Sequence, residues 1–212
     1  MQVANLDAVD IVQALFKQRG YTFFASPADY DLNLFGIRRA TSSNLFDDLI
    51  GCAYRDVVGG PLLLELWAAT TDPGAPFLRE PLPGTKGTAI VVPKQYRGLW
   101  KLGLHKGRPA FEEVGPIDVF RDATRDAILH MDPATAERGN FKINGHDTVT
   151  KVTRVDRQSA GCQVWWDPED HKRALALGRK QVERHPKWDT FTYTLFDARQ
   201  DPLADALFYA AV

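Results

Sequence analysis

The sequence predicts a mainly β fold, an antiparallel β sandwich or barrel with an N-terminal helix and one helix near the C-terminal end. Short segments in which apolar and polar residues alternate follow one another from residue 36 onward, and Gly and Pro residues separate them. Only one long stretch beyond residue 36 has helical spacing. With 212 residues, 44% of them hydrophobic and 25% charged, the chain is long enough to enclose one well-filled core.

The first predicted element is a helix over residues 6–18, which Arg19-Gly20 ends. Its apolar residues recur at helical spacing: Leu6, Val9, Ile11, Val12, Leu15 and Phe16. Residues 21–36 are rich in aromatic residues and Asp, which indicates an irregular lead-in. Since no linker or internal repeat interrupts the rest, we expect an N-terminal helical lead over residues 1–35 and one β-rich domain over residues 36–212.

The strands of the β-rich domain are expected where apolar residues alternate between turn signals: LLLELWAAT (62–70), GTAIVVP (87–93), LWKLGLH (99–105), PIDVFRD (116–122) and DTFTYTLFD (189–197). A helix is expected from residue 168 to about His185, because Asp167-Pro168 supplies an N-cap and a proline for the first turn. The apolar tail over residues 203–212 predicts a terminal helical turn.

Charge and hydropathy exclude several classes of partner. Lys and Arg number 26 against 27 Asp and Glu, so the chain lacks the basic excess that nucleic-acid binding requires. No apolar run approaches the roughly 20 residues of a membrane-spanning helix. The first 20 residues lack the pattern of a secretory signal, so we expect synthesis in the cytoplasm without a signal peptide.

The two cysteines predict different roles. Cys52 lies among apolar residues and is expected to be a small buried core residue. Cys162 follows Ser159-Ala160-Gly161 and precedes the polar Gln163, which is typical of a turn. No C-x-x-C pair occurs, so we expect no zinc site, and we expect no other metal or cofactor.

Cys162 and His146 together are the candidate catalytic pair. A cysteine nucleophile needs a nearby imidazole that takes the thiol proton and passes it to the leaving amine. Ser159 is expected to orient the loop or the base. The backbone N–H groups of Ala160, Gly161 and Cys162 are the expected oxyanion hole, because Gly161 permits a tight turn.

His146, twelve intervening residues and Ser159-Ala160-Gly161-Cys162 form the pattern H-x12-S-x-G-C. This pattern resembles the signature of the L,D-transpeptidase (YkuD-type) catalytic domain. The segments WAATTDPGAPF (67–77) and GTAIVVPKQYRGLWKLGLHKG (87–107) resemble further family segments in the same chain order, so the resemblance spans about residues 36–166. The combination of ATTDPG, RD and SAGCQV is similar to phage-borne relatives of this domain.

Two positions depart from the family pattern. Asp147 stands where the family usually has Gly, and it is expected either to polarise His146 or to face solvent. Gln163-Val164 stands where the family usually has an arginine that holds the substrate carboxylate, so Arg154, Arg157 or Lys151 is expected to replace it. The expected substrate contacts are Tyr96, Trp100, Gln163 and Arg154. The other histidines are expected mostly at the surface: His105, His130, His171 and His185.

The resemblance implies cysteine-dependent acyl transfer or hydrolysis on peptidoglycan stem peptides, as a transferase or hydrolase at the cell wall or periplasm, or in a phage lytic or virion-associated role. Phage virion proteins are then possible partners. The alternative is a non-catalytic β-sandwich, either a virion structural protein or a wall-binding module. A papain-like hydrolase is disfavoured, since Cys precedes His in that class and follows it here.

Overall fold

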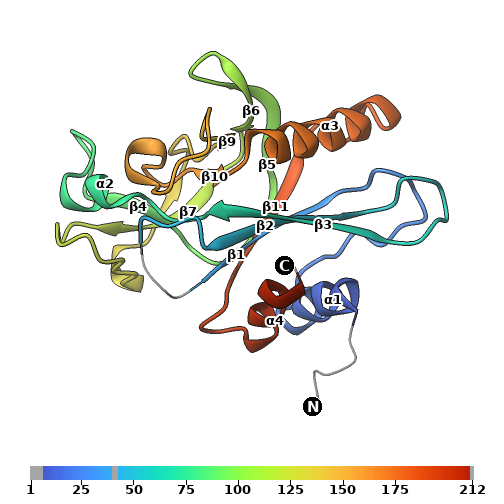
Figure 1. The fold of residues 1–212 in the computed structure, drawn as a ribbon, viewed down its shortest axis with the longest axis horizontal. Helices are drawn as coiled ribbons and strands as arrows, with labels where there is room; N and C mark the ends of the chain where they lie inside the picture. The colour runs from blue at the N-terminus through green and yellow to red at the C-terminus, as the bar shows by residue number, and fades with distance from the viewer. Residues whose placement is uncertain (1–6, 40–42, 211–212) are drawn as a thin grey trace.

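The computed structural model describes residues 7–39 and 43–210, and its fold is mainly β, as predicted (Figure 1). The strands found in these residues are β1 (Asn33–Arg38), β2 (Asp48–Tyr54), β3 (Leu63–Thr70), β4 (Thr88–Val91), β5 (Gln95–His105), β6 (Arg108–Glu113), β7 (Ile117–Asp122), β8 (Glu137–Gly139), β9 (Gly145–Asp147), β10 (Gln163–Trp165) and β11 (Phe191–Asp197). The helices are α1 (Ala8–Gln18), α2 (Ala75–Arg79), α3 (Pro168–Arg184) and α4 (Pro202–Ala210), with two short 3-10 helices, η1 (Pro133–Thr135) and η2 (Asp156–Gln158).

Eight of the strands close a barrel in the order β1-β11-β5-β6-β9-β10-β3-β2, and β4-β7-β8 form a second, small sheet. Most neighbouring strands in the barrel are antiparallel. The pairs β1–β11 and β9–β10 are parallel, which corrects the prediction of an antiparallel sheet at these two places. Parallel neighbours require a long crossover, and the loop between β9 and β10 provides one.

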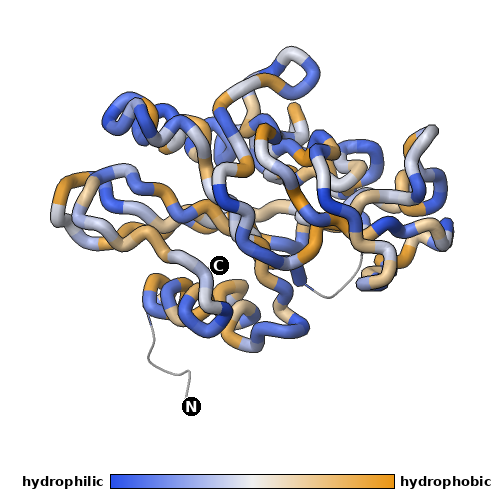
Figure 2. Tube along the Cα trace, turned by 180° about the vertical axis from the view of Figure 1, so that it is seen from behind, coloured by the Kyte–Doolittle hydropathy of each residue, from blue (hydrophilic) through white to orange (hydrophobic). Residues whose placement is uncertain are grey.

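The barrel interior is packed with large aromatic side chains. Trp100, Phe111 and Trp165 have no exposed surface, and the ring centroids of Phe111 and Trp165 lie 5.9 Å apart. Figure 2 shows hydrophobic residues running along the strands, with hydrophilic residues frequent in the surrounding loops. Cys52 in β2 is also fully buried, as predicted. The core therefore forms a rigid support for the residues on its outer face.

A second apolar cluster joins the N-terminal and C-terminal helices to the barrel. Figure 1 shows α1 and α4 side by side, and their buried residues pack against β1, β2 and β11. β1 begins at Asn33, so residues 33–36 are strand rather than irregular lead-in, and the predicted division between residues 35 and 36 falls inside it. All six residues of β1 are buried, because both faces of the strand are covered. The sequence of β1 therefore lacks the alternation of apolar and polar residues by which a strand is predicted.

The predicted helices are confirmed where the structure describes them. α1 matches the predicted N-terminal helix, with Leu6 outside the described residues. α3 begins after Asp167, whose side chain accepts a hydrogen bond of 3.0 Å from the Glu169 N–H. α4 matches the predicted terminal turn up to residue 210. Within residues 7–39 and 43–210, no helix combines the length and the apolar character needed to cross a membrane.

Candidate active site

His146 lies on β9, and Cys162 directly precedes β10, the strand that pairs with β9. β9 and β10 pair in parallel, with Gln163 opposite Gly145 and Val164 opposite His146. Registered neighbours in a sheet share a face, so the Val164 and His146 side chains leave the sheet on the same side, and Cys162 stands two residues before Val164. The opposite face is the barrel core, where a Cβ on Gly145 would lie 3.0 Å from Trp165. The fold thus places His146 on β9 and the predicted nucleophile at the turn that leads into the neighbouring β10.

Ser159 holds the turn that presents Cys162. Its hydroxyl donates to the Cys162 carbonyl at 2.8 Å and accepts the Gly161 N–H at 3.1 Å. Gly161 has φ +128°, and a Cβ there would lie 2.7 Å from the Ala89 carbonyl oxygen, so glycine is required by conformation and by space. The Gly161 N–H is bound to Ser159, whereas the Ala160 and Cys162 amides of the predicted oxyanion hole have no acceptor among residues 7–39 and 43–210.

The Cys162 thiol is nearly buried, with 8% of its surface exposed, and it donates to the Lys142 carbonyl at 3.4 Å. Burial raises the pKa of this thiol to about 11, and the Asn144 backbone N–H opposes the rise. The resting site therefore holds a neutral thiol. A base close to the sulfur is needed to form the thiolate at neutral pH.

His146 has the tautomer that such a base requires, and no hydrogen bond joins it to the Cys162 sulfur among the described residues. Its Nδ1 lies 2.8 Å from the Asp147 carbonyl oxygen, which can only accept, so the proton of the neutral ring is on Nδ1. Its Nε2 is buried and has no hydrogen-bond partner among the described residues. Burial lowers the pKa of this imidazole to about 4, which keeps Nε2 unprotonated at neutral pH.

The Asp147 side chain does not face solvent, which corrects one of its two predicted roles. It is 8% exposed and forms an ion pair of 2.9 Å with Arg108 Nη2. Asp147 acts on His146 through its backbone carbonyl, and its carboxylate is directed to Arg108 instead. In serine and cysteine hydrolases, a group that fixes the ring of the base is a recurring part of the site.

Two histidines assigned to the surface lie beside the pair. The His105 ring is half-buried and stacks on the His146 ring, with 4.3 Å between centroids and 3° between planes. His171 is 1% exposed and lies 3.7 Å from Asp147, too far for a hydrogen bond. His171 belongs to a stripe of small and apolar residues on α3 with Ala174, Leu175 and Gly178, and that helical spacing was the signal for its burial.

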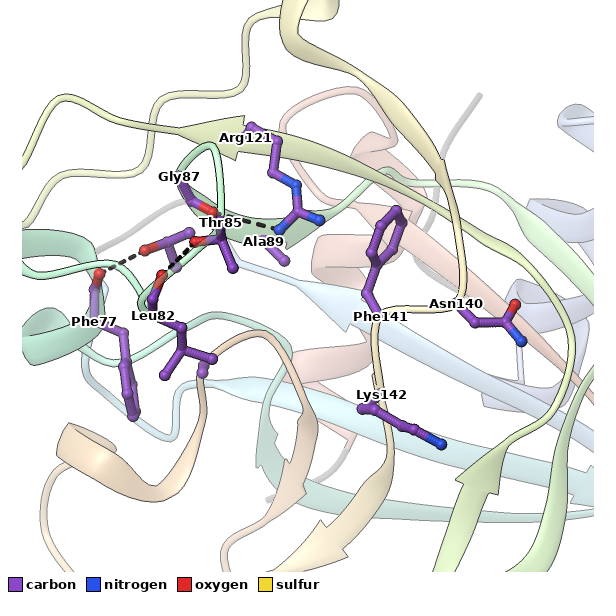
Figure 3. A pocket seen from close by; sticks show the side chains of 11 residues that line it. Phe77, Leu82, Thr85, Gly87, Ala89, Arg121, Asn140, Phe141 and Lys142 are labelled. Atoms are coloured by element: carbon purple, nitrogen blue, oxygen red, sulfur yellow. Dashed lines mark hydrogen bonds between the residues drawn. The ribbon is translucent and has the colours of Figure 1, made fainter.

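Two cavities border the segment before Cys162, one at Gln158 and one at Ala160, and Cys162 itself lines neither. One, of about 190 Å³, is lined by His105, Lys106, Arg108, Pro109, His146, Asp147, Val149 and Gln158. The other, of about 240 Å³, reaches Ala160 and Lys142 from the other side of the turn. Figure 3 shows Arg121 beside Phe141 at one wall of this second cavity, with Phe77 and Leu82 across from them. The Arg121 guanidinium stacks 4.5 Å from the Phe141 ring centroid.

Three predicted substrate contacts are corrected because their side chains are buried. Trp100 and Gln163 have no exposed surface and Tyr96 is 3% exposed. Trp100 Nε1 donates to the Ile143 carbonyl, Tyr96 donates to the Val92 carbonyl, and Gln163 accepts from the Tyr193 hydroxyl at 2.7 Å. Arg154, the fourth, is exposed, and neither cavity is lined by it. Aromatic and amide side chains in strands gave no sign of which face they occupy.

Within the described ranges, no group of three or more His, Cys, Asp or Glu side chains is arranged to hold a metal ion. Comparison with family models, with curated proteins and with solved structures finds no match to this chain. The resemblance to the L,D-transpeptidase domain therefore rests on the motif and its chain order alone.

Proposed function

We propose that this protein carries out cysteine-dependent acyl transfer or hydrolysis on peptidoglycan stem peptides, with Cys162 as nucleophile and His146 as base. The observation that carries the proposal is the state of His146: its Nδ1–H is fixed by a carbonyl, and its buried Nε2 has no partner. An unsatisfied buried acceptor is destabilising by about 1–3 kcal/mol. We attribute it to a role in proton transfer from Cys162, whose thiol is bound to the Lys142 carbonyl in this structure.

The chemical step follows from these positions. The thiol leaves the Lys142 carbonyl and turns to His146, whose Nε2 takes its proton as Sγ bonds to the substrate carbonyl carbon. The amides of Ala160 and Cys162 stabilise the oxyanion. When the tetrahedral intermediate collapses, the C–N bond breaks and the proton on His146 Nε2 goes to the departing amine. Water or a second amine then attacks the thioester and releases Cys162.

The two cavities support an extended peptide that passes over the turn. His146 must reach the departing amine to protonate it, so the leaving group occupies the cavity beside His146 and the acyl part faces the cavity beside Ala160. Arg121 lines the acyl side but is already paired with Glu137 at 2.9 Å, so we assign it no substrate carboxylate in place of the predicted Arg154. The resemblance supplies the substrate class: an amide between a diaminopimelate-type residue and D-alanine.

The altered position after Cys162 favours hydrolysis over cross-linking. We place the activity at the cell wall, in a lytic or virion-associated setting. The family usually has an arginine there that holds the substrate carboxylate, whereas this chain has Gln163-Val164, and Gln163 is buried. Loss of that cation removes the family's usual hold on the substrate, whereas water needs no binding site of its own.

The test is turnover of purified disaccharide-tetrapeptide fragments, followed by chromatography and mass spectrometry. Wild-type protein and Cys52→Ala are expected to release D-alanine, and Cys162→Ala and His146→Ala to release none. Cys52 is the matched control because it is a fully buried thiol on β2, away from both cavities. Unchanged fragments with wild-type protein, together with binding to intact sacculi, would instead assign a non-catalytic wall-binding module.

A further inference from the structure

His105 is a second imidazole with a defined protonation state in the cavity beside His146. It is the last residue of β5 and precedes a two-residue turn, Lys106-Gly107, in which both residues have positive φ. This turn fixes the end of β5 against β6, where His105 pairs with Arg108. The ring is therefore held by a tight hairpin on one side and by the stacked His146 ring on the other.

The tautomer of His105 follows from its hydrogen bonds. Asn144 Oδ1 accepts the Glu113 backbone N–H at 2.9 Å, and a backbone N–H can only donate. The other end of the Asn144 amide, Nδ2, must then donate, and it lies 2.9 Å from His105 Nδ1. His105 Nδ1 is therefore an acceptor, and the proton of its neutral ring is on Nε2.

The two stacked rings thus have opposite tautomers. His146 carries its proton on Nδ1 and offers a lone pair at Nε2, while His105 carries its proton on Nε2. Within the described residues, His105 Nε2 has no hydrogen-bond partner and is not among the buried unsatisfied atoms. Both rings line the cavity of about 190 Å³, with Lys106 and Arg108 at the same wall.

We propose that His105 binds the leaving group of the reaction: its Nε2–H donates to the carboxylate of the departing D-amino acid, beside the cation Lys106. This rests on the proposed function, which places the departing amine next to His146. Arg108 is already paired with Asp147, so Lys106 supplies the positive charge and His105 supplies a directed neutral donor. The pair holds the amine within reach of the proton on His146.

The tautomers are tested first, without any substrate. Long-range ¹⁵N–¹H correlation spectra of the imidazoles at about pH 8 should show the proton of His105 on Nε2 and that of His146 on Nδ1. Assignments come from the loss of signals in His105→Gln and His146→Gln. A His105 ring protonated on Nδ1 would overturn the proposal, whether or not the protein has activity.

The binding role is tested with two matched variants. Glutamine places an amide N–H near the position of Nε2, whereas asparagine places its amide near Nδ1. His105→Asn is expected to raise KM for the tetrapeptide fragment about tenfold with a smaller change in kcat, and His105→Gln to stay within about threefold of wild type. A carbapenem has no separate leaving group, and both variants remove the ring stacked on His146, so His105→Asn and His105→Gln should form the Cys162 adduct at equal rates. An equal rise in KM in both variants would assign His105 a packing role only and overturn the proposal.

The two hypotheses fail separately. If wild-type protein forms no carbapenem adduct and releases no D-alanine, the proposed function is wrong, while the tautomer spectra still report the state of His105. If the adduct forms and the KM of His105→Asn is unchanged, the proposed function stands and the leaving-group role of His105 is wrong.

Discussion

At the scale of single residues, the site depends on a few positions whose local chemistry leaves little choice. Gly161 turns the chain into Cys162 with φ +128°, Ser159 bridges the turn, and the Asp147 carbonyl fixes the His146 ring. The sequence pattern indicated the roles of Gly161 and Ser159, because small residues directly before a nucleophile allow the backbone to make a tight turn. It did not reveal that Asp147 acts through its carbonyl, since a backbone contact carries no residue signature.

Gly161→Ala is expected to destabilise the protein by about 2–3 kcal/mol, because the side chain would meet the Ala89 carbonyl oxygen in a backbone region open mainly to glycine. Gly107→Ala is the control: it also has positive φ, but a Cβ there meets nothing within 4 Å. The control should lose only about 1 kcal/mol. Urea unfolding measures both, and equal losses would show that the packing against Ala89 is unimportant.

At the scale of elements, β9 and β10 position the pair, and each has only three residues. So short a strand shows no readable alternation, which is why neither was predicted although the longer strands β3, β5 and β11 were. The loop before Cys162 is held from outside by Asn44. Its Oδ1 accepts the N–H groups of Ala75 and Asp156, and its Nδ2 donates to the Asp156 carboxylate at 2.9 Å.

Asn44 has φ +79°, so Asn44→Gly keeps the backbone conformation and removes the three side-chain hydrogen bonds. We expect a loss of about 2 kcal/mol in unfolding free energy and a slower reaction of Cys162 with a carbapenem, because the loop is no longer anchored. Asn44→Asp alone would set a second carboxylate against Asp156, so the comparison is the double variant Asn44→Asp/Asp156→Asn, which retains the acceptor for the N–H groups of residues 75 and 156 and should react faster than Asn44→Gly. Identical adduct rates for the two variants would show that Asn44 does not position the loop.

At the scale of the whole molecule, the prediction of a mainly β fold is confirmed. The structure consists of a barrel with an apolar core, two helices packed against the barrel, and a small second sheet. The parallel pairs and the place of β1 were not predictable, since they depend on contacts between segments far apart in the chain. Burial of His146 on β9 and of His171 on α3 also has a global consequence. Burial lowers the pKa of both imidazoles to about 4.

Stability should therefore fall in acid. Between pH about 6.5 and about 4 the unfolded chain binds a proton on His146 and the folded chain does not, so the free energy of unfolding decreases as pH falls through this window. Wild-type protein is expected to lose about 2.5 kcal/mol more than His146→Gln between about pH 7.5 and about pH 4.5. Urea unfolding at both pH values measures this, and parallel losses in the two proteins would place the His146 pKa near its ordinary value.

The central claim is that Cys162, and not Cys52, is an activated nucleophile. Intact-mass and peptide-mapping mass spectrometry after incubation with a carbapenem tests it most directly, because such a lactam traps the acyl-enzyme. We predict one adduct on wild-type protein and on Cys52→Ala, mapped to the peptide that contains Cys162, and none on Cys162→Ala. An adduct that persists in Cys162→Ala, or a wild-type protein that forms none, would contradict the account.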